Sequence, residues 1–134
     1  MTRRVLVADT AEGDRRIAAI LAGYELEFVR TLDAARRALQ DDGFDLVLIG
    51  VHFDDSRMFD LLRYMQANPE KPGRCVVCMR SQRFASTAIT IEGLEIAAKT
   101  LGCALFLDLT WYTDDANGNQ AVRSLLDALI TAAP

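Results

Sequence analysis

The sequence is short of the side chains that most often carry chemistry: among 134 residues it has one histidine, one tryptophan and three cysteines. His52 has no serine or cysteine partner in a recognisable nucleophile turn, so a catalytic dyad is not expected. An odd number of cysteines argues against a disulfide framework and fits a reducing cytoplasm. Cys75 and Cys78 spell C-x-x-C, but on a strand they would face opposite sides, so zinc binding is not expected.

Long apolar runs and excess positive charge are also missing. No apolar run approaches the roughly 20 residues that a transmembrane helix needs, and the start, MTRRVLVADT, indicates a first strand rather than a signal peptide. The formal net charge of -4 argues against nucleic-acid binding. The sequence shows no glycine-rich phosphate-binding loop, because GNQ at 118–120 lacks the preceding strand and the lysine of such a loop. We therefore expect a cytoplasmic domain with no membrane or nucleic-acid contact and no cofactor.

The chain does contain a regular alternation of short apolar runs and helical patterns, which indicates one domain over residues 1–134. Thr31 and Ser56 are expected to cap the second and third helices, and Gly23 and Gly43 to end the first and second. The expected strands are 4–8, 25–29, 45–49, 75–79 and 104–107, and the expected helices are about 12–22, 31–42, one from Ser56, 86–101 and about 120–132.

This pattern predicts an α/β fold with helices on both faces of a parallel sheet. Residues 45–49 are apolar at every position but the first, as a central parallel strand should be. For a chain of this size we expect the flavodoxin-like three-layer sandwich, with five strands in the order 2-1-3-4-5 and five helices.

Four stretches, in this order, resemble the receiver domain of bacterial response regulators: RVLVADTAEGDRRIAAIL, GYELEFVRTLDAARRAL, FDLVLIGVHFDDSRMFDLLRYM and LGCALFLDL. The resemblance covers nearly the whole chain and implies a CheY-like fold. In that family an aspartate ending the third strand accepts a phosphoryl group, and acids after the first strand hold Mg²⁺. A hydroxyl after the fourth strand and a lysine after the fifth bind the phosphoryl oxygens.

Carried over to this chain, the resemblance retains little of that site. The acidic pair falls on Asp9 and Thr10, the phosphoacceptor on Gly50, the hydroxyl on Arg80 or, one residue later, Ser81, and the lysine on Leu109. Glycine offers no nucleophile and leucine no charge, while phosphoryl transfer needs a carboxylate, a divalent cation and a positive side chain. Asp9 alone is a weak metal candidate. The sequence therefore predicts a pseudo-receiver that is not an enzyme.

Two features of the degenerate pocket leave alternatives open. Asp54 and Asp55 form either a solvated turn or a relocated phosphoacceptor or metal ligand. Arg80 either points to solvent or reaches Asp9, Asp54 or Asp108, and we predict a pair with Asp9, which would place a built-in cation in the pocket. A third hypothesis is that Arg80 and helix N-termini hold a small anion or nucleotide.

The resemblance also implies a signalling face, formed by helix 86–101, strand 104–107 and helix 120–132. Phe106 matches an aromatic position that family members use as a packing switch. Trp111 and Tyr112 either fold back on the last helix or anchor a partner, since exposed aromatic residues are favoured hot spots. We expect phosphorylation-independent contact with a protein partner, such as a kinase, an output domain or another signalling protein, or a homodimer through this face.

Overall fold

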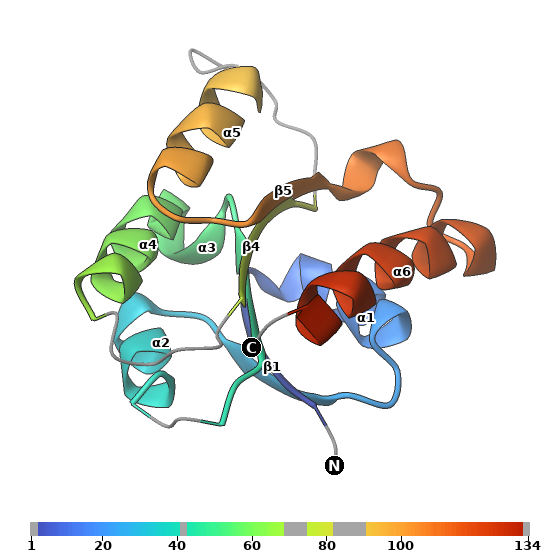
Figure 1. The fold of residues 1–134 in the computed structure, drawn as a ribbon, viewed down its shortest axis with the longest axis horizontal. Coiled ribbons are helices and arrows are strands. Elements are labelled where there is room, and N and C mark those ends of the chain that lie inside the picture. Colours follow the sequence, from blue (N-terminus) through green and yellow to red (C-terminus); the bar gives the residue numbers. More distant parts are fainter. Residues whose placement is uncertain (1–2, 41–42, 69–74, 82–90, 133–134) are drawn as a thin grey trace.

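Five parallel strands form one sheet in the order β2-β1-β3-β4-β5 (Figure 1). The computed structural model describes residues 3–40, 43–68, 75–81 and 91–132. The strands are β1 (Arg4–Ala8), β2 (Glu25–Val29), β3 (Leu46–Gly50), β4 (Cys75–Arg80) and β5 (Leu105–Asp108). The strand order and the flavodoxin-like topology predicted from the sequence are confirmed, and every predicted strand lies within one residue of its observed bounds.

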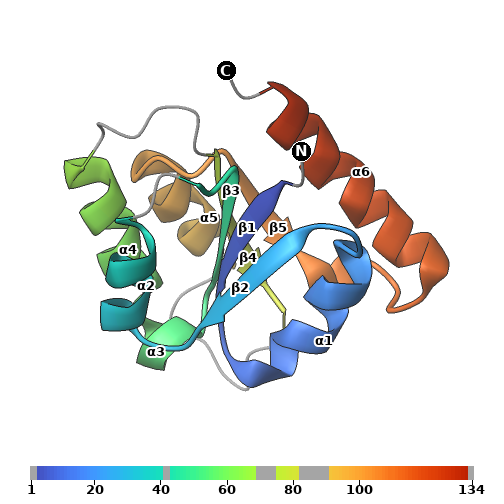
Figure 2. The same cartoon turned by 90° about the horizontal axis from the view of Figure 1, so that it is seen from below.

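Helices cover both faces of the sheet (Figure 2). One face carries α1 and α6, and the other carries α2, α4 and α5. None of the described helices is long and apolar enough to cross a membrane. The helices are α1 (Ala11–Ile20), α2 (Leu32–Ala38), α3 (Phe53–Ser56), α4 (Met58–Ala67), α5 (Ile91–Thr100) and α6 (Ala116–Ala132), with a 3-10 turn, η1 (Leu109–Trp111), between β5 and α6.

The central strands are apolar on both sides because both sides are covered. Alternate residues of a strand point to opposite faces, so Val5 and Val7 of β1 pack toward α1 and α6, whereas Leu6 and Ala8 pack toward the other helices. All five residues of β3 are buried. This double burial is typical of a parallel sheet and sets β1, β3 and β4 as the centre of the core.

The last helix begins earlier than its apolar pattern indicates. The predicted helix covers about residues 120–132, but α6 starts at Ala116, inside the preceding polar stretch TDDANGN. Asp115 Oδ1 accepts a 2.8 Å hydrogen bond from the Gly118 N–H, as an N-cap side chain does. A single capping bond thus extends the helix over residues of poor helix propensity. In the preceding helix, predicted for 86–101, α5 is observed over Ile91–Thr100, and residues 86–90 lie outside the described ranges.

The expectation of five helices, with Ser56 as the cap of the third, is wrong. The described residues include a sixth helical turn, α3, whose Asp54 and Asp55 have left-handed backbones with φ of 46° and 55°. Ser56 also has a positive φ, 67°, whereas an N-cap residue needs an extended backbone. The longer helix, α4, starts at Met58 after Arg57, which makes no side-chain capping bond.

Candidate functional site

The carboxyl ends of the central strands surround one buried carboxylate, that of Asp9. Asp9 follows β1 and is 1% exposed. Its Oδ2 accepts a 3.2 Å hydrogen bond from the Ser81 hydroxyl, just past the end of β4. Its Oδ1 is buried without a hydrogen-bond donor among the residues that the structure describes. Of the two residues considered for the hydroxyl position, Ser81 is therefore the one that reaches the centre of the site.

The Asp9 carboxylate lies directly over Gly50, in the space that a side chain at the end of β3 would take. A Cβ built on Gly50 would lie 1.9 Å from Asp9 Oδ1 and 2.3 Å from its Cγ. A Cβ on Gly13, in α1, would lie 2.4 Å from Asp9 Oδ2. Two glycines from different elements thus leave room for one carboxylate. With the Asp9 carboxylate in this position, residue 50 has no room for a side chain.

Burial dominates the electrostatics of Asp9. Removal from water raises the pKa of the Asp9 carboxyl above its ordinary value, and the nearby Asp14 carboxylate adds to the rise. The Thr10 backbone N–H, which lies near the carboxylate without the geometry of a full hydrogen bond, and the Ser81 hydroxyl lower the pKa and offset part of the shift. Ionisation of Asp9 therefore lowers the free energy of unfolding.

The residues do not fit the Mg²⁺ ion that the receiver resemblance implies. Asp9 is turned onto Gly50 and bonded to Ser81, and Thr10 and Gly50 add no carboxylate. Within the described ranges, no group of three or more histidine, cysteine, aspartate or glutamate side chains could hold a metal ion. Mg²⁺ sites usually draw on more than one carboxylate or on phosphate oxygens.

Arg80 pairs with Asp108, so the predicted pair with Asp9 is not what the structure contains. The two residues are neighbours in register at the ends of β4 and β5. Arg80 Nη1 lies 3.1 Å from Asp108 Oδ2, and the side chains are only 14% and 8% exposed. Asp108 Oδ1 also accepts hydrogen bonds from the backbone N–H and hydroxyl of Thr110. Strand register decides the pairing, because it sets the two last residues of adjacent strands side by side.

We expect Arg80→Ala to lower the melting temperature by several degrees. Its loss leaves the buried Asp108 without its cation, at a cost of about 1 to 3 kcal/mol, and about 1 kcal/mol shifts a domain of this size by a few degrees. In a double-mutant cycle the loss should shrink in an Asp108→Asn background and stay the same in an Asp9→Asn background. The reverse pattern, with coupling to Asp9 and none to Asp108, would contradict this pairing.

Asp54 has a structural partner that the sequence did not indicate. Its Oδ2 accepts a 2.8 Å hydrogen bond from the backbone N–H of Leu32, the first residue of α2. The Thr31 hydroxyl accepts a second bond from the Ala34 N–H, which confirms Thr31 as the cap of that helix. Asp54 therefore satisfies a helix N-terminus across a loop, where a carboxylate is favoured, while Asp55 is exposed.

The remaining positions carried over from the receiver resemblance are structural here. Leu109 is fully buried and packs with Val122 and Leu126 of α6 in the core. Thr10 stands at the N-cap of α1 but its side chain accepts no capping bond. The strand ends therefore gather Asp9, Gly50, Ser81, Arg80 and Asp108 into one edge of the sheet, with Leu109 turned away from that edge into the core.

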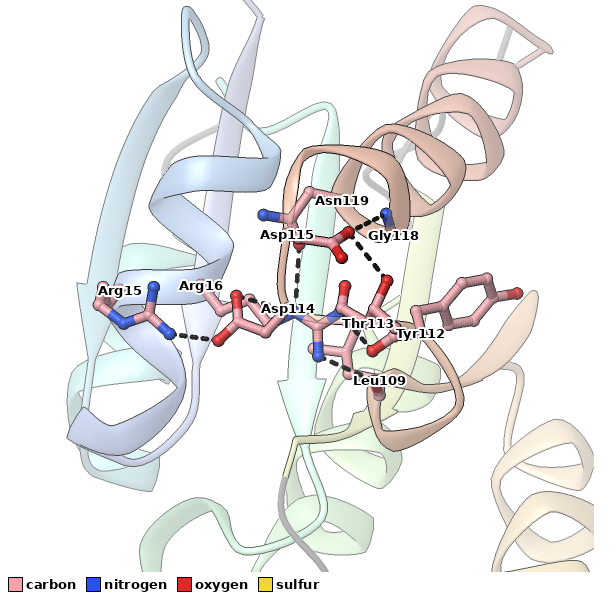
Figure 3. A network of polar contacts seen from close by, with 9 residues as sticks. All are labelled: Arg15, Arg16, Leu109, Tyr112, Thr113, Asp114, Asp115, Gly118 and Asn119. Carbon is pink, nitrogen blue, oxygen red and sulfur yellow. Dashed lines mark hydrogen bonds and ion pairs between the residues drawn. The ribbon is translucent and has the colours of Figure 1, made fainter.

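Arg16 of α1 is the largest feature that the sequence did not reveal (Figure 3). Its guanidinium donates to the carbonyls of Leu109 (2.8 Å), Tyr112 (2.8 Å) and Thr113 (2.9 Å), and to Asn119 Oδ1 (3.2 Å). The side chain is 13% exposed. A positive group thus ties the segment after β5 to α1 and to the first turn of α6. Helical spacing sets Arg16 on the side of α1 that carries the buried Gly13 and Ile20, but it does not indicate the partners. The neighbouring Arg15 is 74% exposed and pairs with Asp114.

A groove of about 220 Å³ lies along β5, between α5 and α6. Phe106 is at its strand side and only 8% exposed, whereas Trp111 at its rim is 82% exposed. Tyr112 is half-buried and packs against the core on the α1 and α6 side. The two predicted aromatic neighbours therefore separate: Tyr112 folds back, and Trp111 projects to solvent. The full lining is Ile91, Glu95, Leu105, Phe106, Leu107, Asp108, Trp111, Tyr112 and Leu125.

Solved structures of response regulators are similar to this chain over nearly its whole length. A response regulator from Thermotoga maritima has a TM-score of 0.74 at 16% identity, covering 98% of this chain and 100% of that one. The phosphorylated cyanobacterial phytochrome response regulator RcpA has a TM-score of 0.74 at 17% identity, covering 100% and 98%. An orphan response regulator of H. pylori has a TM-score of 0.69 at 12% identity, covering 96% of each chain.

These similarities establish the class of fold: the chain has the CheY-like receiver fold of response regulators. No protein-family model and no curated protein matches the sequence. At identities of 12 to 17% the likeness speaks for the fold alone. What the site does must come from its own residues.

Proposed function

We propose that this chain is a pseudo-receiver, a receiver-like signalling domain that works in the bacterial cytoplasm by protein–protein contact without being phosphorylated. It is not an enzyme and uses no cofactor. Its partner is a kinase, an output domain, another signalling protein or a second copy of the chain.

The observation that carries the proposal is the position of the Asp9 carboxylate over Gly50. The 1.9 Å approach to a Gly50 Cβ means that the pocket is filled by a side chain of the protein itself. Phosphoryl transfer to a carboxylate needs that nucleophile at the strand end, with a cation for the developing charge. Gly50 supplies no nucleophile, and the buried Leu109 supplies no charge. Arg80, the nearest cationic candidate considered from the sequence, is paired with Asp108.

Two alternatives are weakened by the contacts of their residues. Asp54 accepts a hydrogen bond from the Leu32 N–H at the N-terminus of α2, and a phosphoryl group on Asp54 would have to compete with that bond. An anion or nucleotide held by Arg80 would have to compete with the 3.1 Å ion pair to Asp108. The experiments below would detect either alternative.

We expect acetyl phosphate with Mg²⁺ to leave the intact mass of the protein unchanged, because no carboxylate stands at the end of β3. A phosphorylatable receiver domain treated in parallel is the control. A gain of one phosphoryl group that disappears in Asp54→Ala or Asp55→Ala would show a relocated acceptor.

A thermal-shift screen separates the same alternatives. Stabilisation by Mg²⁺ with beryllofluoride would favour an active receiver, and stabilisation by a nucleotide would favour a binding module.

The groove beside β5 supports the face formed by α5, β5 and α6 as the contact surface. These are the elements of the face expected from the sequence. Trp111 and Leu125 line the groove and are exposed by 82% and 39%. Exposed aromatic side chains next to a groove are favoured anchors for a protein partner.

We expect Trp111→Ala to change the free energy of unfolding by no more than about 0.5 kcal/mol, because the side chain is mostly in solvent. Tyr112→Ala, its matched neighbour, should lower the melting temperature by several degrees, because a half-buried ring leaves the core with a cost of about 1 to 3 kcal/mol. Sedimentation at rising concentration tests the homodimer, which Trp111→Ala should weaken. Equal destabilisation by the two substitutions would mean that Trp111 is a packing residue.

A further inference from the structure

The segment that follows β5, residues 109–113, is anchored to the rest of the molecule on both sides of Trp111. Before Trp111, the Leu109 side chain is fully buried, and its carbonyl accepts a 2.8 Å hydrogen bond from Arg16 Nη1. On the other side, the carbonyls of Tyr112 and Thr113 accept bonds of 2.8 and 2.9 Å from Nη2 of the same arginine (Figure 3). One guanidinium therefore holds the backbone both before and after the tryptophan.

The first turn of α6 packs against the same segment at Thr113. A Cβ built on Gly118 would lie 1.8 Å from the Thr113 carbonyl oxygen and 2.8 Å from its backbone nitrogen. The Thr113 hydroxyl donates a 2.8 Å hydrogen bond to Asp115 Oδ1, the oxygen that also accepts the Gly118 N–H. The carbonyl that Arg16 binds is therefore also placed by the close approach of α6.

Trp111 itself is 82% exposed, so packing does little to hold its ring. The rotamers open to a side chain depend on the φ and ψ of its own residue, so the backbone decides where an exposed ring can stand. Leu109 and Tyr112 turn their side chains into the core on the α1 and α6 side. The place of Trp111 at the rim of the groove that it lines therefore depends on the anchored backbone around it.

We propose that Arg16 is the positioning residue for Trp111 and holds it at the rim of the groove beside β5 before any partner binds. Where Trp111 anchors a partner, which rests on the function proposed above, a backbone already ordered lowers the entropy lost on binding. Helix α1 thus shapes this surface, although the described lining of the groove includes no residue of α1.

The test is nitrogen relaxation, measured by NMR on the free domain, which reports the order of the backbone at each amide. Because the chain has one tryptophan, selective labelling of tryptophan gives a single backbone amide signal, that of Trp111. In the native sequence we expect its order parameter to be about 0.85, the value of rigid backbone. In Arg16→Ala, measured well below its melting temperature, we expect it to fall below about 0.6, the value of a flexible segment.

Arg123→Ala is the matched control for a purely structural effect. Arg123 lies on α6 and donates to the carbonyls of Ile20 and Ala22 at 3.4 and 2.6 Å. Its loss therefore loosens the contact between the same two helices but removes none of the bonds from Arg16 to residues 109–113. The order parameter of Trp111 should keep its native value in this variant.

Two results would overturn the proposal. One is an order parameter of Trp111 below about 0.6 in the native sequence, which would mean that the segment is not held. The other is a native value in folded Arg16→Ala, or an equal fall in Arg16→Ala and Arg123→Ala. If Arg16→Ala does not fold, Arg16→Lys takes its place, and a native value there would overturn the proposal as well. These measurements need no partner, so they can fail while the function proposed for the groove stands.

Discussion

Arg16→Ala should lower the melting temperature of this domain by about 10 °C or more. Arg16 donates hydrogen bonds to three backbone carbonyls, and its removal takes this donor from the carbonyls of Tyr112 and Thr113 and leaves the Leu109 carbonyl with the Tyr112 N–H alone. Each stranded acceptor costs about 1 to 3 kcal/mol, and the lost packing of a side chain that is 13% exposed adds to this. We therefore expect a loss of about 3 to 5 kcal/mol, measured by thermal and urea unfolding.

Arg15→Ala is the matched control, since it removes the same side chain from the neighbouring position of α1. Arg15 is 74% exposed, and its ion pair with Asp114 is at the surface, so its loss should cost no more than about 0.5 kcal/mol. Arg16→Lys keeps the charge, but its single ammonium nitrogen cannot reach the acceptors that Nε, Nη1 and Nη2 of the guanidinium reach separately, and it should show most of the destabilisation. Equal effects of Arg15→Ala and Arg16→Ala would show that the Arg16 bonds contribute little.

Asp9→Asn should stabilise the protein at neutral pH by several degrees. Burial raises the pKa of Asp9 in the folded state, so the unfolded chain loses this proton at lower pH than the folded one does. Stability of the native sequence therefore falls as the pH rises from about 4, the ordinary pKa of aspartate, through the folded-state pKa, and then levels off. Asparagine fits the same space, can accept the Ser81 bond and has no charge to bury. The gain should thus be small near pH 4 and largest above the folded-state pKa.

The measurement is the difference in melting temperature between Asp9→Asn and the native sequence from pH 4 to 8, in a buffer without divalent cations. Asp60→Asn is the control, because Asp60 is 51% exposed and pairs with Arg63 at the surface. It should change stability by no more than about 0.5 kcal/mol across that range. A destabilising Asp9→Asn at neutral pH, or a difference that does not grow with pH, would mean that ionised Asp9 is well compensated where it lies.

The candidate site was predictable where it depends on strand ends. The predicted strands ending at Ala8, Ile49 and Met79 bring their next residues to one edge, since parallel strands end together. This is why Asp9, Gly50 and Arg80 could be assigned to one pocket. The partners within that pocket could not be assigned, because Arg80 could reach Asp9 or Asp108 from its position. Strand register, Arg80 opposite Asp108, decides between them.

The sequence by itself determined the fold. Periodicity of 2 and 3.6, with β3 apolar throughout, leaves a five-stranded parallel sheet covered on both faces as the arrangement that buries these side chains. These are local patterns, and each can be read within a window of a few residues. The resemblance to receivers rests on the same patterns.

Only the tertiary structure decided which side chains meet across the sheet. The bonds of Arg16 to the segment after β5 and of Asp54 to the first N–H of α2 each join distant parts of the chain. The close approach of Asp9 to Gly50 is of the same kind. Such contacts depend on distances of a few tenths of an ångström, set by how helices pack on the sheet. No local pattern encodes them, because a charged or polar residue leaves the same mark in the sequence whether it faces water or a partner.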